Sequence, residues 1–261
     1  MNRVRNPAVA GLFYPGDPTA LRQTVEALLA EVPANGPAPK AVIAPHAGYV
    51  YSGPIAATVY ARLASARDTI RRVVLLGPSH RLAFYGLALC RADTFLTPLG
   101  PVPVDTAAFD LIAGLHQVQI VEGAHAAEHS LEVQLPFLQV VLSEFKLVPL
   151  VVGDASPDAV AEVLDRLWGG PETLIVVSSD LSHYHDYATA RRLDEETSRL
   201  IETLSRVEID GEQACGCRPI NGLLRAARSH GLRASALDLR SSGDTAGPRD
   251  RVVGYGAYAF A

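Results

Sequence analysis

RRVVLLGPSH, residues 71–80, is an apolar run that stops at a Gly-Pro pair and ends in a histidine. A second run, AVIAP, ends in the same way at His46, and a third, LIVVSSDLS, contains Asp180 and leads to His183. Short apolar runs of this kind are typical of strands buried on both faces of a parallel sheet. Ligands and catalytic groups gather at the carboxyl ends of such strands. We therefore expect a metal ion at this edge, with an acid–base group beside it.

Strand and helix signals alternate along the chain. Asp17 and Ser156 each precede a proline and an amphipathic stripe, which predicts capped helices, and another helix is expected between Pro219 and Gly231. A leucine stripe at 131–142 predicts a further helix, kinked by its proline. Short β-branched runs predict strands at 41–45, 73–77, 147–152, 173–178 and 252–260.

These elements predict an α/β fold, with a mostly parallel central sheet and helices on both faces. Segment 84–104 differs, because short strands with proline-rich turns there indicate a small antiparallel extension. The chain has no internal repeat or long linker, so we expect one domain over residues 1–261.

Composition excludes several classes of protein. The net charge of −5 argues against a nucleic-acid or anionic-membrane partner, and no signal peptide or membrane span is expected. Three cysteines are an odd number, which argues against a disulfide framework and suits a reducing compartment. We expect a cytoplasmic protein whose thiols are free to bind metal.

The two strand-end histidines, His46 and the one at position 80, are the first candidate ligands. Each alone is more often structural than a ligand, but two on independent strand ends favour metal binding, since neutral imidazole is the commonest metal ligand. His46 lies in PHAGYVYSG, where the hydroxyl of Tyr49 is a candidate contact to substrate. His80 lies in LGPSH, which lacks the pattern of a phosphate-binding loop.

Asp180 and His183 are three residues apart in the densest polar segment, VVSSDLSHYHDY. The carboxylate can orient the imidazole, or both can face a substrate, with His183 as general acid or base. The alternative is that this segment caps the next helix and its histidines face solvent. His185 is a further ligand candidate that is equally well explained as an exposed residue.

His129 and Glu132 also lie three apart, at the start of the leucine stripe. They are candidates for groups that fix the tautomer of a ligand, or for an ordinary helix-entry pair. Cys215 and Cys217 flank a glycine beside an arginine and a helix start, a setting that favours a thiolate. Spacing alone does not decide whether His129 and Glu132 support a metal ligand, or which of the two cysteines binds a metal.

Seven motifs occur in the order found in the Memo family, and together they cover almost the whole chain. They are AGLFYPGD, PHAGYVYSG, LGPSH, EHSLEVQLPFL, VVSSDLSHY, CGCRPI and VGYGAYAF. The chain thus resembles the Memo family, whose bacterial and archaeal members are also called AmmeMemoRadiSam system protein B. That family's fold is similar to the class III extradiol dioxygenases, which use non-haem Fe(II).

The resemblance implies that His46, His80 and Cys215 form a metal triad, with Asp180 and His183 beside the metal. Cys215 stands where the dioxygenases have a carboxylate, and a thiolate also suits Zn or Cu. Fe(II) is the metal we expect first, with Cu or Zn as alternatives. The resemblance further implies a functional link to AMMECR1-like and radical-SAM proteins.

Three functions follow from these residues. The first is a dioxygenase-like metal oxidoreductase that binds a small-molecule or peptide ligand in the metal pocket. The second is a binding or adaptor module on an enzyme-like scaffold. The third is a metal-dependent hydrolase with His183 or Glu132 as base. We rank the oxidoreductase first and the hydrolase last.

Overall fold

Four buried parallel strands form the centre of the structure, a computed structural model that describes residues 3–33 and 36–261. In sheet order they are β2 (Ala41–Ala44), β9 (Thr173–Ser178), β3 (Arg72–Pro78) and β8 (Lys146–Val152). All pairings among these four are parallel. Their carboxyl ends therefore meet at one edge, as the apolar runs predict.

Antiparallel strands extend the sheet on both sides. On one side β12 (Val252–Phe260) pairs with β2, and β10 (His183–His185) and β11 (Ala234–Ser241) pair with β12. On the other side β4 (Leu87–Leu89) is antiparallel to β8 and parallel to β7 (Val118–Ile120). The predicted α/β class is confirmed, and its antiparallel part is larger than segment 84–104 alone.

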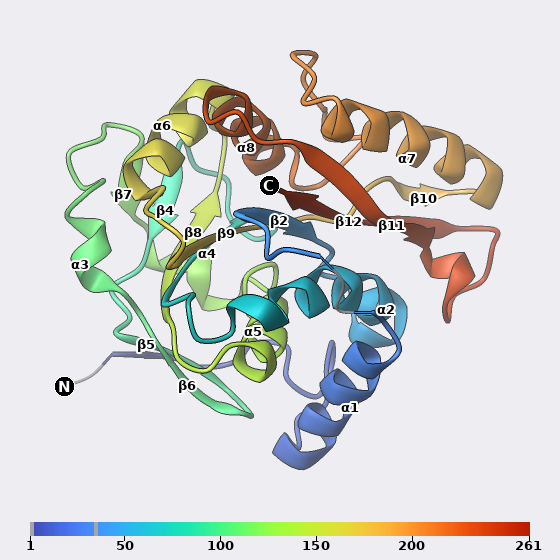
Figure 1. Cartoon of the computed structure of the whole chain (residues 1–261), viewed down its shortest axis with the longest axis horizontal. Coiled ribbons are helices and arrows are strands. Elements are labelled where there is room, and N and C mark those ends of the chain that lie inside the picture. Colours follow the sequence, from blue (N-terminus) through green and yellow to red (C-terminus); the bar gives the residue numbers. More distant parts are fainter. Residues whose placement is uncertain (1–2, 34–35) are drawn as a thin grey trace.

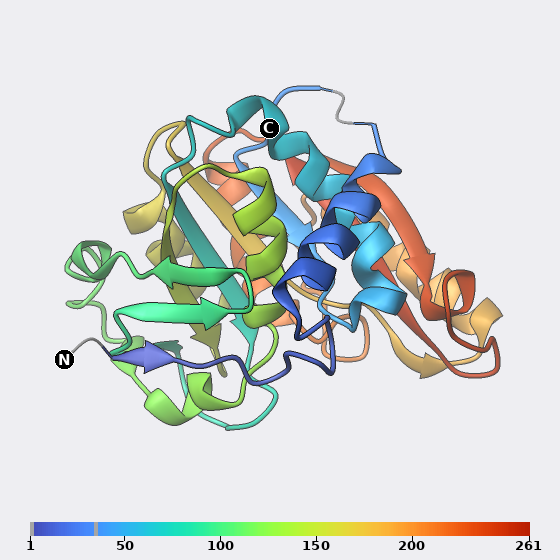
Figure 2. The ribbon, with the colours of Figure 1, turned by 90° about the horizontal axis from the view of Figure 1, so that it is seen from below.

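A second, three-stranded sheet contains the rest of that segment. β5 (Thr94–Thr97) and β6 (Gly100–Pro103) form an antiparallel hairpin, and β1 (Val4–Arg5) adds to β5 in parallel. The hairpin lies in front of the main sheet in Figure 2, beside the N-terminal strand. This arrangement brings residues 4–14 close to the segment that follows β7.

Helices cover both faces of the main sheet (Figure 1). One face packs against α1 (Pro18–Ala30), α2 (Tyr49–Tyr60) and α5 (Leu135–Val141). The other packs against α6 (Pro157–Leu167), α7 (Tyr187–Glu202) and α8 (Cys217–Ser229). The short helices are α3 (Thr106–Phe109), α4 (Glu122–Ala126) and 3₁₀ turns at Ala61–Ala66, Glu132–Gln134 and Ser242–Asp244.

The predicted caps of α1 and α6 are confirmed. Asp17 Oδ1 accepts a hydrogen bond from the backbone of Ala20 at 2.8 Å, and Ser156 accepts one from Ala159 at 3.2 Å. Such bonds satisfy backbone N–H groups that a helix start leaves free.

Two helix predictions need correction. The stretch 131–142 is not one kinked helix: a 3₁₀ turn leads into α5, and Pro136 lies in the first turn of α5, where its missing N–H costs nothing. α8 begins at Cys217, two residues before the predicted start at Pro219.

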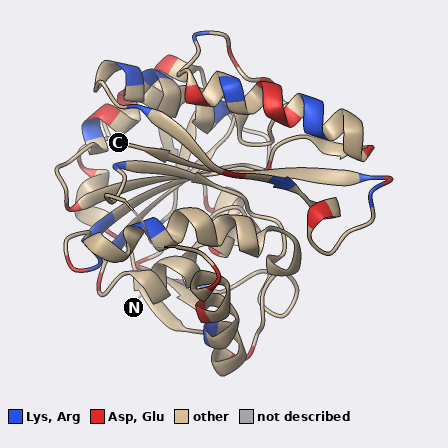
Figure 3. Ribbon diagram, turned by 45° about the vertical axis from the view of Figure 1, so that its right-hand side comes forward, with Lys and Arg blue, Asp and Glu red and all other residues tan. Residues whose placement is uncertain are grey.

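Charged residues of both signs occur along α7, while the central strands carry few (Figure 3). Among the described residues, no helix is long and apolar enough to cross a membrane.

Candidate metal centre

His46 lies two residues after the end of β2, and its surroundings fix which ring nitrogen carries the proton. Its Nδ1 lies 2.9 Å from the hydroxyl of Ser178. That hydroxyl donates its only hydrogen to the carbonyl of Ser130, and it also receives a hydrogen bond from Gln134 Nε2. The hydroxyl therefore accepts from His46, whose Nδ1 must be protonated. The lone pair of His46 lies on Nε2, the position a metal ligand needs.

His80 follows β3 and is held in the same tautomer by a carboxylate. Its Nδ1 lies 2.9 Å from Glu128 Oε1, and its backbone N–H donates to Glu128 Oε2 at 2.6 Å. Burial by itself raises the pKa of Glu128, but its bonds to His80 outweigh burial and lower that pKa to about 2. The carboxylate thus accepts the Nδ1 proton and leaves Nε2 free to bind a metal.

Cys215 lies in the loop before α8, and the next residue must be glycine for this loop to reach the sheet. A Cβ on Gly216 would lie 2.6 Å from Cβ and Oγ of Ser179, too close for any side chain. The Gly216 N–H donates to Ser179 Oγ at 2.9 Å, which anchors the loop. Burial, followed by the charge of Asp180, raises the pKa of the Cys215 thiol far above its usual value. The expected thiolate is therefore not formed by the protein alone.

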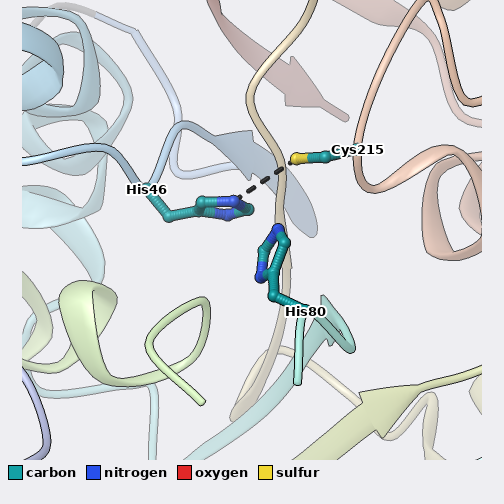
Figure 4. A group of neighbouring side chains, drawn as sticks. All are labelled: His46, His80 and Cys215. Carbon is teal, nitrogen blue, oxygen red and sulfur yellow. Dashed lines mark hydrogen bonds between the residues drawn. The ribbon is translucent and has the colours of Figure 1, made fainter. Parts of the chain in front are cut away.

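The three donors converge as the resemblance implies (Figure 4). The Sγ of Cys215 lies 3.3 Å from His46 Nε2, and the ligand atoms of His46, His80 and Cys215 all lie within 4.8 Å of one another. A metal with bonds of about 2.0–2.3 Å to four ligands holds them roughly 3.3–3.8 Å apart. Small side-chain movements suffice to reach that geometry, so the donor set fits a single metal ion.

Two titratable groups flank the triad. Asp180 is buried, and its Oδ1 accepts a hydrogen bond from the backbone of His46 at 2.7 Å. Burial raises the pKa of Asp180 to about 7, although the N–H groups of His46 and Ala47 act against this shift. His183, at the start of β10, is half-buried, and burial lowers its pKa, so it is neutral at physiological pH. A neutral base and a carboxyl that titrates near neutrality can both exchange protons with a bound molecule.

A cavity of about 860 Å³ opens onto the triad and contains both of these groups. Its walls include side chains that the sequence did not single out. They are Phe13, Tyr51, Arg81, Tyr184, Arg251 and Tyr255. The four aromatic residues lie in the motifs AGLFYPGD, PHAGYVYSG, VVSSDLSHY and VGYGAYAF, which could have drawn attention to them, whereas the two arginines lie in none of the seven motifs.

His129 lies against the triad, as expected for a neighbour of the ligands. Its ring stacks on that of His80 with centroids 4.6 Å apart, and its Nδ1 lies 3.4 Å from Glu128 Oε1. Burial, followed by the charge of His80, lowers the pKa of His129 to about 4. The structure therefore places a neutral imidazole beside the candidate ligands.

Glu132 and Tyr49 lie elsewhere. The Glu132 carboxylate forms a buried ion pair with Arg5 and accepts hydrogen bonds from Tyr14 and from the backbone of residues 8 and 9. Tyr49 is buried in the core and donates to the carbonyl of Val133 at 2.7 Å. The acid that fixes a ligand tautomer is Glu128, four residues earlier, and the cavity tyrosine nearest in sequence is Tyr51. Tyr49 and Glu132 are the first residues of α2 and of the 3₁₀ turn, respectively, and both side chains are buried away from the cavity.

The remaining candidates stay outside the triad. Cys217 is the first residue of α8, and His185 is the last residue of β10. Among the described residues, neither belongs to a group of three side chains close enough to share a metal.

Known proteins resemble this chain over almost its whole length. The sequence profile of the Memo family, described as Memo-like protein, matches residues 5–259. A MEMO1 family protein of Aquifex aeolicus is 37% identical over 265 residues, covering 97% of each chain. One from Sulfolobus acidocaldarius is 36% identical over 282 residues, covering 98% of this chain and 99% of the relative.

A solved structure shares the fold. An uncharacterized protein from Escherichia coli K12 superposes with a TM-score of 0.52 at 14% identity, covering 82% of this chain and 98% of the other. At that identity the likeness concerns the fold alone.

Proposed function

The chain belongs to the Memo family, and on that premise we propose that it is a mononuclear non-haem iron protein with redox activity toward a small chelating substrate. One observation supports this above the others: two imidazoles with protonated Nδ1 and one thiol meet at an open cavity. Three protein ligands leave coordination positions for other molecules.

His46, His80 and Cys215 would hold the metal. A bound Fe(II) supplies one-electron chemistry and a positive charge that favours deprotonated oxygen ligands. Ser178 and Glu128 keep the two imidazoles aimed at the centre whether or not the metal is present. The protein therefore has little reorganisation left to perform when the ion binds.

Asp180 and His183 would move protons at the substrate. A chelating hydroxyl must lose its proton as it binds, and the neutral ring of His183 in the cavity wall can accept it. Asp180 has a pKa of about 7, so it can hold or release a proton near neutral pH. Its position is fixed by the N–H of His46, which keeps the carboxyl beside the ligands.

Metal content of protein purified without oxygen tests the proposal. We expect close to one iron per chain in the wild type, and loss of iron in Cys215→Ala and His80→Ala. Cys90→Ala is the matched control, because Cys90 is a buried free thiol outside the cavity. Iron retained in Cys215→Ala would refute the triad.

Oxygen consumption then tests the redox step. Iron-loaded protein should consume O₂ with a chelating compound, and His183→Gln should slow this at unchanged iron content. Zinc in place of iron, with ester or amide cleavage, would favour a hydrolase. Partner binding that is unaffected by metal removal would favour a binding module. Since a thiol ligand must stay reduced, we infer a cytoplasmic location, which cell fractionation tests.

A further inference from the structure

Two arginines lie in the wall of the metal cavity, and neither is neutralised by an acid. Arg81 directly follows the ligand His80, and Arg251 directly precedes β12. Within residues 3–33 and 36–261, neither guanidinium forms an ion pair. Arginine keeps its charge at any physiological pH, so both present full positive charges to whatever enters.

Arg251 stacks on the ring of Tyr184, a residue with a rare backbone conformation. Tyr184 has a φ of 63°, in the left-handed region that non-glycine residues rarely adopt, and 63% of its surface is exposed. The pairing of β10 with β12 is irregular here, between His183 and His185. The Cζ of Arg251 lies 4.5 Å from the centroid of the Tyr184 ring. A ring face holds a guanidinium by cation–π attraction without occupying its N–H donors.

The other titratable groups of the cavity leave this positive charge largely unbalanced. Asp180 is already engaged by backbone N–H groups, and the other carboxylate of the lining is the exposed Glu212. A cavity with such a balance favours an anionic ligand.

Aromatic side chains set the shape of that ligand. Phe13, Tyr51 and Tyr255 lie in the cavity wall together with Tyr184. Flat apolar walls with a few polar groups suit a planar organic molecule. A single stacked guanidinium matches the two oxygens of a carboxylate.

We propose that the substrate is a small planar carboxylate, bound by its chelating oxygens at the metal and by its carboxylate at Arg251, with Arg81 adding to the positive field. This inference rests on the proposed function and adds to it the chemical class of the substrate. Arg251 would be a specificity-determining residue, set in position by Tyr184.

Binding of matched compounds to the metal-loaded protein tests this. Catechol, 4-methylcatechol and 3,4-dihydroxybenzoate share one chelating pair and differ at the opposite ring position, which is bare, apolar or anionic. Isothermal titration under anaerobic conditions gives a Kd for each. We expect the carboxylated compound to bind roughly tenfold or more tightly than the other two, as for one charge-assisted hydrogen bond.

Arg251→Gln should reduce this preference to near unity, and Arg251→Lys should restore part of it. Arg249→Gln is the matched control, because Arg249 also stacks on a tyrosine, Tyr187 at 4.4 Å, but is paired with Asp244 and lies outside the cavity lining. It should leave the preference unchanged.

The outcomes separate this inference from the proposed function. Equal binding of all three compounds, or a preference that survives in both Arg251→Gln and Arg81→Gln, overturns the carboxylate site and leaves the chelation proposal standing. Kd values that are unchanged by metal removal, with the carboxylate preference intact, support the anion site and contradict chelation. No binding of any compound at millimolar concentration overturns both.

Discussion

Replacing Glu128 by glutamine would measure how far the proposed metal centre depends on a residue outside its ligand set. The Glu128 carboxylate accepts hydrogen bonds from His80 Nδ1 at 2.9 Å and from the backbone of His80 at 2.6 Å. It also accepts from the backbone N–H groups of His129 and Ser130, both at 2.9 Å. Glutamine keeps the size, but one of its two oxygens becomes an N–H₂ group that faces donors.

The structure gives the size of the effect. The pKa of Glu128 is about 2 instead of the ordinary 4.5, so the folded protein favours its charged form. A shift of this size corresponds to about 3 kcal/mol of stability. Because the folded-state pKa is depressed, this stability is present above about pH 4.5 and is lost as the pH falls toward 2.

Urea unfolding of the metal-free protein checks that magnitude. Glu128→Gln should be less stable than wild type by about 3 kcal/mol at neutral pH, and the gap should narrow below pH 4.5. Metal affinity, from competition with a chelator, should fall about 10- to 100-fold, as for other residues that orient a ligand.

Glu122→Gln is the matched control, since Glu122 starts the neighbouring helix α4 and accepts a backbone hydrogen bond at 2.6 Å from Arg91, outside the metal cavity. It should leave metal affinity unchanged. If Glu128→Gln binds metal within about twofold of wild type, the carboxylate does not orient His80 and the reasoning is wrong.

Three further variants probe separate features. Gly216→Ala should lower metal content at least as much as Cys215→Ala, because the added Cβ would lie 2.6 Å from Ser179 and displace the loop that carries Cys215. Metal analysis of the folded variant checks this, and a full complement of metal in Gly216→Ala would contradict it. Asp194→Asn should be more stable than wild type by about 1–3 kcal/mol above pH 6. Burial raises the pKa of Asp194 to about 6, so the wild-type protein loses stability as the pH rises from 3.8 to 6 and this carboxyl ionises. Urea titrations at several pH values check the sign. Glu132→Gln should cost about 3–5 kcal/mol, because it leaves the buried charge of Arg5 unpaired; a loss below 1 kcal/mol would refute that role.

Much of the central sheet and the approach of His46 to His80, two of the three candidate ligands, were predictable from sequence. A continuous apolar run of strand length indicates a buried strand, and a Gly-Pro pair or a proline after it indicates where the chain leaves the sheet. His46 and His80 follow such ends, so their meeting required only that the strands be parallel. The prediction held because a parallel sheet places all its carboxyl ends on one side.

Other parts of the site depend on contacts between distant segments, which periodicity does not reveal. Cys215 could be assigned only through the family motif, because the loop that carries it has no regular structure. His129 and Glu132 are three residues apart, which would bring their side chains together on a helix. The helical turn begins only at Glu132, so the two side chains do not share a face, and the acid that contacts a candidate ligand is Glu128, beside His80. The thiolate expected from a nearby arginine is opposed by burial, which sequence spacing does not report.

The origins of the three donors have a consequence for how such a site can change in evolution. The two histidines lie two residues beyond the ends of β2 and β3, the core strands on either side of β9, so their positions are set by the sheet. The third donor arrives on a loop whose contact with the sheet needs only the small Gly216 beside it. Exchange at position 215, between a thiol and a carboxylate for example, can therefore change the preferred metal while the scaffold stays the same. Proteins with this fold can therefore come to bind a different metal, and so catalyse a different reaction, through substitution at one position.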